Sequence, residues 1–241
     1  MSFSTDLVNL TQLFSKDCSE LTLSFDGYIY NPLDYAWENH KFYLENYVKD
    51  SASVLFLGMN PGPFGMMQNG IPFGEVETVK TYLKCTQKIG RPEKEHPARP
   101  VLGLSCPKSE VSGKRFWGLI KSSYPVATDF AEKYCVFNYC PLGFLLPTPT
   151  SRNATPDHLP AEERKLLEAL CDRYLECVID LIKPDYLIGV GKYAEKRILS
   201  NPAAKGKVVS SIIHPSPGNP QANNHWQENT EEKLRSLNIW N

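Results

Sequence analysis

The chain has 241 residues, of which 41% are hydrophobic and 22% charged, and its formal net charge is −1. This length suffices for one substantial hydrophobic core, and no stretch resembles an interdomain linker, so we expect a single domain over 1–241. The apolar runs are too short to cross a bilayer and the N-terminus lacks a signal-peptide core, which predicts a soluble intracellular protein. The near-neutral charge excludes a global attraction to nucleic acid, so any such affinity must be local.

The cysteines and basic residues limit which metal sites and nucleic-acid contacts are possible. Seven cysteines without a Cys-x-x-Cys pair are typical of reduced thiols, and they lack the close ligand spacing of an iron–sulfur cluster. We therefore expect no metal. Two basic clusters could contact nucleic acid, although solvated surface is the commoner explanation for each: Lys108 with Lys114 and Arg115, and Lys192 with Lys196 and Arg197.

The predicted elements alternate between helices and short strands. In chain order, the apolar spacing predicts a helix over 35–48, a strand over 53–57, a helix over 74–83, a strand over 134–137, a helix over 161–182, a strand over 186–190, a helix over 192–200 and a strand over 208–213. Such alternation is typical of crossover connections. We expect an α/β fold with a mostly parallel central sheet flanked by helices.

The helix predicted over 161–182 has the clearest pattern. Pro160 suits its first turn, and Pro184 forbids its continuation. The side chains expected on its buried face are Leu166, Leu167, Leu170, Tyr174, Cys177, Val178, Leu181 and Ile182.

Unusual polar loops follow three of the predicted strands. They span 58–65, 138–141 and 214–220. Ligands of parallel sheets bind beyond the carboxyl ends of the strands, so Asn60, Asn138 and His214 could share one cleft. The first loop is rich in glycine and proline but lacks the Gly-Lys-Ser/Thr ending of a phosphate-binding loop.

Each candidate side chain also has a plain structural interpretation. Phe73, between prolines and glycines, could stack on a nucleobase or lie tucked into the core. Asn138 could read a base edge or form an Asx turn before Pro141. His214 could donate a hydrogen bond to a developing anion or serve only the fold.

Taken together, these motifs resemble the single-strand-selective monofunctional uracil-DNA glycosylases of the uracil-DNA glycosylase superfamily. Residues 58–66, Gly-Met-Asn-Pro-Gly-Pro-Phe-Gly-Met, with 72–76 are similar to the active-site stretch of that family. Residues 138–142 resemble its base-reading motif, and residues 214–223 resemble its histidine and DNA-wedge loop. Residues 109–113, 115–118 and 189–191 match as well. The similarity runs from about residue 24 to the C-terminus, and about 1–22 forms an extension outside it.

The resemblance implies roles for these residues. Phe73 would stack on an extruded pyrimidine, and Asn138 would bond its N3 and O4 edge. Gly62 would lie near C5 and leave room for substituents such as hydroxymethyl, and Met59 would also contact the base. His214 and Asn60 would be catalytic, without a cofactor.

The resemblance also implies an unusual mechanism. Asn60 stands where faster uracil glycosylases place an aspartate, and it can orient a water but cannot accept a proton as a carboxylate would. We expect no carboxylate in the site, whereas most glycoside hydrolases use two. The reaction would be dissociative, with His214 stabilising the departing uracil anion at O2. The matched motifs hold no lysine placed for a Schiff base, which favours hydrolysis over strand cleavage.

The DNA-contacting loop departs from the family at one position. The family often carries an arginine where this chain has Gly218, and a glycine cannot fill the gap left by an extruded base. Activity on duplex DNA would then be weaker, unless neighbouring side chains substitute. The residues expected to contact DNA are Ser216, Pro217, Gly218, Asn219, Pro220, Gln221 and Asn223.

We therefore expect a monomeric glycosylase that removes uracil and 5-substituted uracils from single-stranded and duplex DNA and leaves an abasic site. Such a repair role implies the nucleus in a eukaryote and the cytoplasm otherwise. The open alternatives are a sister-subfamily glycosylase for mismatched thymine or uracil, and a catalytically silent module that binds nucleic acid. A phosphate enzyme using the first loop fails for want of metal-binding carboxylates beside it.

Overall fold

The protein is described by a computed structural model that covers residues 2–240. Its centre is a four-stranded parallel sheet in the order β3-β2-β6-β7. The strands are β2 (Val54–Gly58), β3 (Tyr134–Asn138), β6 (Tyr186–Val190) and β7 (Val208–Ile212). The α/β fold with a parallel central sheet is therefore confirmed, and each strand lies within a residue or so of its predicted bounds.

A second, antiparallel sheet was not predicted. It has the order β1-β4-β5, with β1 (Tyr28–Tyr30), β4 (Gly143–Leu145) and β5 (Asn153–Ala154). Strands of two or three residues are too short to show an alternating pattern in the sequence. Its strands β4 and β5 follow the Asn138 loop in the chain.

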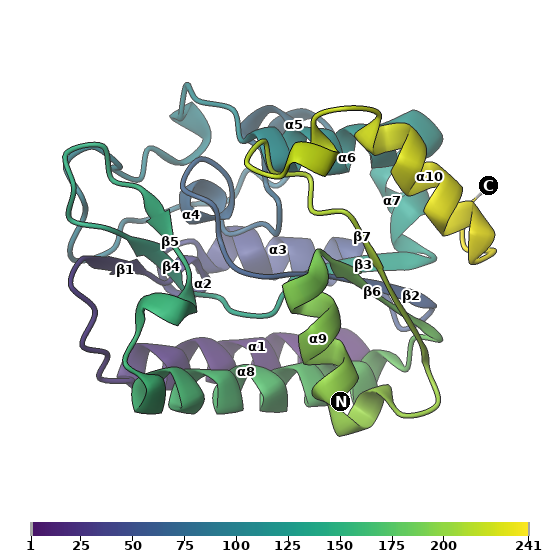
Figure 1. The fold of residues 1–241 in the computed structure, drawn as a ribbon, viewed down its shortest axis with the longest axis horizontal. Coiled ribbons are helices and arrows are strands. Elements are labelled where there is room, and N and C mark those ends of the chain that lie inside the picture. The colour runs from purple at the N-terminus through teal and green to yellow at the C-terminus, as the bar shows by residue number, and fades with distance from the viewer. Residues whose placement is uncertain (1, 241) are drawn as a thin grey trace.

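Helices cover both faces of the parallel sheet (Figure 1). The ring of Phe56 in β2 lies 5.7 Å from that of Phe116 in α6 (Val111–Ser123). The next side chain, Leu57, points the other way and lies with Leu175 and Val178 of α8 (Ala161–Ile182) around a small apolar space. The two-residue alternation of a strand thus builds one core layer on each face.

The N-terminal segment forms α1 (Phe3–Glu20), which lies along α8 (Figure 1). The rings of Phe14 and Tyr174 stack at 4.1 Å, and the Thr11 hydroxyl is hydrogen-bonded to the Tyr174 hydroxyl at 2.8 Å. Although it lies outside the segment that carries the resemblance, this helix contributes Leu7 and Phe14 to the core.

Two helical predictions need correction. The helix predicted over 35–48 is α3 (Trp37–Tyr47), and a separate short helix, α2 (Pro32–Tyr35), precedes it. The break lies at Ala36, which leaves helical geometry, and the Tyr35 carbonyl accepts from the N–H of Gly90. In α8, Leu166 is 59% exposed. The buried stripe of α8 runs through Leu167, Cys171 and Leu175 at helical spacing, so Leu166 is rotated away from it.

The remaining helices complete the layers. The segment predicted over 74–83 is the shorter α5 (Val76–Thr81), and α9 (Lys192–Ser200) has its predicted bounds. The others are α4 (Met66–Asn69), α7 (Ala127–Ala131) and α10 (Trp226–Ser236). Within residues 2–240, no helix combines the length and apolarity needed to span a membrane.

Candidate active site

The polar loops after β2, β3 and β7 open at the same edge of the sheet. Asn60, Asn138 and His214 all line one cavity of about 410 Å³ there. The parallel register brings them together, since it pairs Gly58 with Asn138 and runs β7 in the same direction beside β6. The structure thus gathers three side chains that the sequence singles out.

Most of the other predicted site residues lie at this cavity. Met59, Gly62 and Phe73 line it. The predicted DNA-contacting loop divides into two parts: Ser216 and Pro217 line the cavity, whereas the following residues stand outside it and are mostly exposed. Those outer residues are Gly218, Asn219, Pro220, Gln221 and Asn223.

Gly58, the last residue of β2, lets two site side chains approach the strand end. A Cβ at this position would lie 2.8 Å from the Phe73 ring and closer still to Oδ1 of Asn138. Asn138 donates through Nδ2 to the sulfur of Met66 at 3.1 Å, which is a weak acceptor. Its amide therefore remains available for a better partner in the cavity.

Phe73 is held in an uncommon backbone conformation, with a φ of 54°. Phe73 is only 7% exposed, and its ring stacks on that of Phe116 with 4.6 Å between the ring centroids. The Trp117 indole donates to the carbonyl of Pro72 at 3.2 Å and fixes the preceding backbone. Core packing on α6 thus orients the Phe73 ring that lines the cavity.

His214 is held as a neutral imidazole. Its Nδ1 accepts from the backbone N–H of Ser216, so the ring proton is assigned to Nε2. Burial lowers the pKa of His214 below its usual value of 6.5. The Trp226 indole donates to the carbonyl of Ile213 at 2.7 Å and anchors the strand end that carries the histidine.

Asn60 supplies a hydrogen-bond donor without a partner. Its Nδ2 is buried and makes no hydrogen bond in the structure. Buried amides are usually satisfied, so an orphaned donor at a cavity wall marks a position where a ligand or water would bind.

The expectation that the site holds no carboxylate is wrong, because Glu110 lines the cavity. Glu110 precedes α6 but makes no capping bond, and its Oε2 is shut off from solvent without a hydrogen-bond partner. Residue 110 falls within a matched segment to which the sequence assigns no role. Nothing in the local spacing links it to the distant glycine loop, so tertiary folding alone reveals the contact.

Glu110 stands near a second acidic side chain, Glu75. Burial, with a smaller contribution from the charge of Glu75, raises the pKa of Glu110 to about 7. Glu75 is partly desolvated, but hydrogen bonds from Thr78 and Ser109 outweigh this effect and lower its pKa. Within residues 2–240, no three His, Cys, Asp or Glu side chains gather as potential metal ligands.

The arginines of the two basic clusters make different contacts. Arg115 donates to the carbonyl of Pro215 at 3.0 Å and to Oδ1 of Asn223 at 3.3 Å, so it braces the loop that is predicted to contact DNA. In the second cluster, Arg197 is paired with Glu168 and Asp172 inside the fold. The first cluster lies beside the cavity. In the second, the charge of Arg197 is balanced by ion pairs within the protein.

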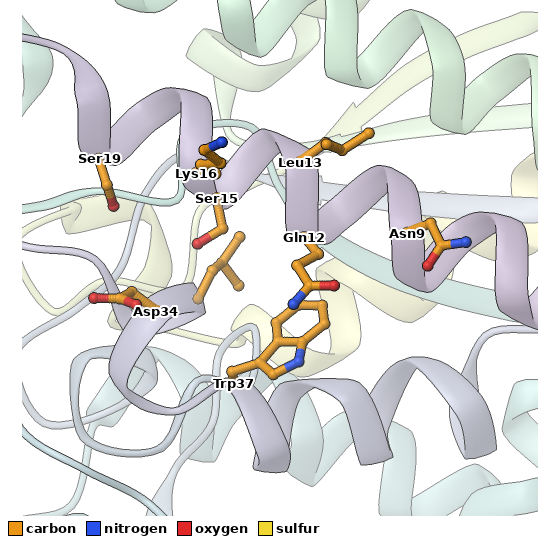
Figure 2. A pocket seen from close by; sticks show the side chains of 9 residues that line it. Asn9, Gln12, Leu13, Ser15, Lys16, Ser19, Asp34 and Trp37 are labelled. Carbon is orange, nitrogen blue, oxygen red and sulfur yellow. The ribbon is translucent and has the colours of Figure 1, made fainter.

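A larger cavity of about 770 Å³ lies between α1 and the α2–α3 segment and shares no lining residue with this site. Figure 2 shows Gln12 of α1 beside Trp37, with Ser15 and Asp34 nearby. None of the side chains from the three strand ends reaches this cavity. The cavity at the sheet edge is therefore the candidate active site.

Comparison with known proteins identifies the family of this chain. The sequence matches the family described as the uracil DNA glycosylase superfamily over residues 29–239. It is 46% identical over 217 residues to a Rattus norvegicus protein named single-strand selective monofunctional uracil-DNA glycosylase, covering 88% of this chain and 77% of that protein. The Bos taurus protein of the same name is 45% identical over 215 residues, covering 88% of this chain and 78% of that protein.

A solved structure also resembles the fold. The crystal structure of wild-type Pedobacter heparinus SMUG2 matches this chain with a TM-score of 0.64 at 19% sequence identity. The match covers 96% of this chain and 98% of that chain. At this identity the likeness bears on the architecture alone.

Proposed function

The chain belongs to the uracil-DNA glycosylase superfamily, and from that premise we propose that it excises uracil and 5-substituted uracils from DNA by hydrolysing the N-glycosidic bond. The substrates are single-stranded and duplex DNA, the product is an abasic site, and the enzyme acts as a monomer. The observation that carries the proposal is the convergence of Asn60, Asn138 and His214 on one cavity.

Substrate binding begins with extrusion of the nucleotide. A base inside the stack cannot reach a cavity at the sheet edge, and unpairing costs least in single strands or at mismatches. The extruded pyrimidine stacks on Phe73, whose ring is already fixed by Phe116. Asn138 offers both a donor and an acceptor. With its amide held in one orientation, Oδ1 accepts from N3–H and Nδ2 donates to O4 of uracil, and the same orientation mismatches cytosine.

Bond breaking is supported chiefly by His214. As the glycosidic bond lengthens, negative charge develops on the uracil ring, and the Nε2–H group donates to O2. A neutral imidazole is suited to this role because its proton stays on Nε2 while Nδ1 is occupied by the N–H of Ser216. The sugar develops oxocarbenium character, as in glycoside hydrolysis.

Asn60 orients the water that completes the reaction. Its orphaned Nδ2 can hold a water oxygen at the cavity wall. An amide accepts no proton, so the water attacks after the leaving group has largely departed. This order makes the stability of the leaving anion the main determinant of rate.

The exposed loop 218–223 contacts DNA beside the cavity. Arg115 braces it from α6, and Asn223 donates through Nδ2 to the carbonyl of Pro217 at 3.1 Å. The loop carries Gly218 at its exposed turn, so no long side chain fills the stack after extrusion. Single-stranded substrates, which need no such filling, are favoured.

A base-release assay tests the proposal. Oligonucleotides of one sequence carry uracil, 5-hydroxymethyluracil, thymine or cytosine, as single strands and as duplexes, and alkali reveals abasic sites. We expect cleavage at uracil and 5-hydroxymethyluracil, fastest in single strands. Tight binding of uracil-DNA without base release would instead indicate a silent binding module, and selective release of mismatched thymine would indicate a sister-subfamily enzyme.

A further inference from the structure

The cavity contains a carboxyl group that the proposed reaction does not use. Glu110 reaches the cavity from the start of α6, and its Oε2 is buried without any hydrogen-bond partner. A buried carboxyl oxygen left unsatisfied costs stability, so its retention calls for a reason in the bound state.

The side chain of Glu110 occupies the space beside the glycines of the first loop. A Cβ added to Gly62 would lie 2.5 Å from Oε2, and one added to Gly65 would lie closer still. The carboxyl group therefore contacts the backbone of this loop and replaces the side chains that the loop lacks. Gly62 and Glu110 thus line the same cavity side by side.

The shape of a pyrimidine determines which of its atoms meet this wall. In the proposed complex, Asn138 takes the N3 and O4 edge, His214 takes O2, and N1 is attached to the sugar. The remaining edge of the ring is C5–C6. Because Gly62 and Glu110 line the same cavity as Asn138 and His214, we place this remaining edge, with C5, against them.

The electrostatic surroundings favour a carboxyl that can donate a hydrogen bond. Burial and the charge of Glu75 both disfavour the ionised form of Glu110, whereas Glu75 itself is held charged by Thr78 and Ser109. A protonated carboxyl has one donor and retains acceptor capacity. It can therefore bond a hydroxyl in either direction.

We propose that Glu110 is a specificity-determining residue whose carboxyl group hydrogen-bonds a polar substituent at pyrimidine C5, such as the hydroxyl of a hydroxymethyl group. This inference rests on the proposed function, because it uses the orientation of the base in that complex. Uracil carries only hydrogen at C5 and makes no such bond. Thymine carries a methyl group, which would leave the carboxyl unsatisfied.

The test compares 5-hydroxymethyluracil with uracil in single-stranded oligonucleotides of one sequence. The readout is the ratio of their kcat/KM values on the same preparation, so any common loss of folded enzyme cancels. Glu110→Ala should lower this ratio about five- to tenfold, the effect of one lost hydrogen bond. Glu110→Gln, which keeps a donor and an acceptor, should restore the ratio to within about twofold. Glu77→Ala, at an exposed position on α5, is the matched control.

An unchanged ratio in Glu110→Ala, whether or not both kcat/KM values fall, would overturn the assignment. So would a wild-type enzyme that releases uracil but neither releases nor binds 5-hydroxymethyluracil. Calorimetric titration of the wild type and both variants with the free bases supplies a readout without catalysis. A protein that releases no base, yet loses its preference for free 5-hydroxymethyluracil in Glu110→Ala, would refute the excision proposal and support the role of Glu110.

Discussion

The imidazole of His214 accepts a hydrogen bond at Nδ1 from the backbone N–H of Ser216, with 3.2 Å between the two nitrogens. The bond joins residues two apart, so the turn after β7 fixes the tautomer without the carboxylate that often orients a catalytic histidine. Protonation of Nδ1 would break it.

This relationship predicts the acid limb of the pH–rate profile. Because the pKa of His214 is lowered by burial, the ring stays neutral as pH falls to 6.5 and gains a proton only at more acidic pH. We expect kcat/KM on single-stranded uracil substrate to decline with an apparent pKa below 6.5. A limb centred at or above 6.5, and absent in His214→Gln, would contradict a neutral donor.

A matched pair of glycine substitutions tests the close packing at the end of β2. Gly58→Ala forces a methyl group against Phe73 and Asn138, so we expect a loss of about 1–3 kcal/mol in unfolding free energy and weaker binding of uracil substrates. Gly118→Ala places its methyl group in open space within α6 and should stabilise the protein by about 0.5–1 kcal/mol. Urea denaturation and substrate titration measure both. Equal behaviour of the two variants would refute the packing argument.

The exposed loop offers a gain-of-function prediction. A Cβ at Gly218 would meet only Oγ of Ser216 at 3.5 Å, an ordinary contact, so an arginine fits without strain. Gly218→Arg should raise the ratio of duplex to single-strand turnover about three- to tenfold, since the long side chain can occupy the gap left in the stack. Leu166→Arg, at a 59% exposed position on α8, controls for added charge. An unchanged ratio would show that this position does not limit duplex activity.

Glu110 predicts a pH-dependent cost in stability. Its pKa rises from 4.5 to about 7 on folding, so the folded state holds a proton that the unfolded chain releases. The cost is absent below pH 4.5, grows between pH 4.5 and about 7, and stays constant above that. At about 1.4 kcal/mol per pKa unit, it reaches about 3 kcal/mol. Glu110→Gln should therefore stabilise the protein at pH 8 by up to this amount and change little at pH 4.5. Denaturation at both values, with exposed Glu77→Gln as control, checks the difference. A loss of stability at pH 8 would mean that the charged form is favoured.

The sequence predicted the parallel sheet and the three strand-end loops because long apolar runs and proline or glycine boundaries are local signals. It located α8 to the residue from Pro160 and Pro184, yet misplaced Leu166, since periodicity alone does not fix where a stripe begins. The short strands β1, β4 and β5 carry no pattern of their own. Glu110 was missed for a different reason. Its contact with Gly62 joins two loops that are far apart in sequence, and no local pattern in either loop indicates that they meet.

The central claim is that the reaction proceeds by stabilising the leaving anion, with His214 as the donor. Single-turnover rates of the wild type and His214→Ala on uracil and on 5-fluorouracil, a better leaving group, test it most directly. We predict that His214→Ala lowers the rate on uracil about 10²- to 10³-fold, lowers it distinctly less on 5-fluorouracil, and leaves substrate binding nearly unchanged. Equal losses on the two bases, or a loss confined to binding, would contradict the account.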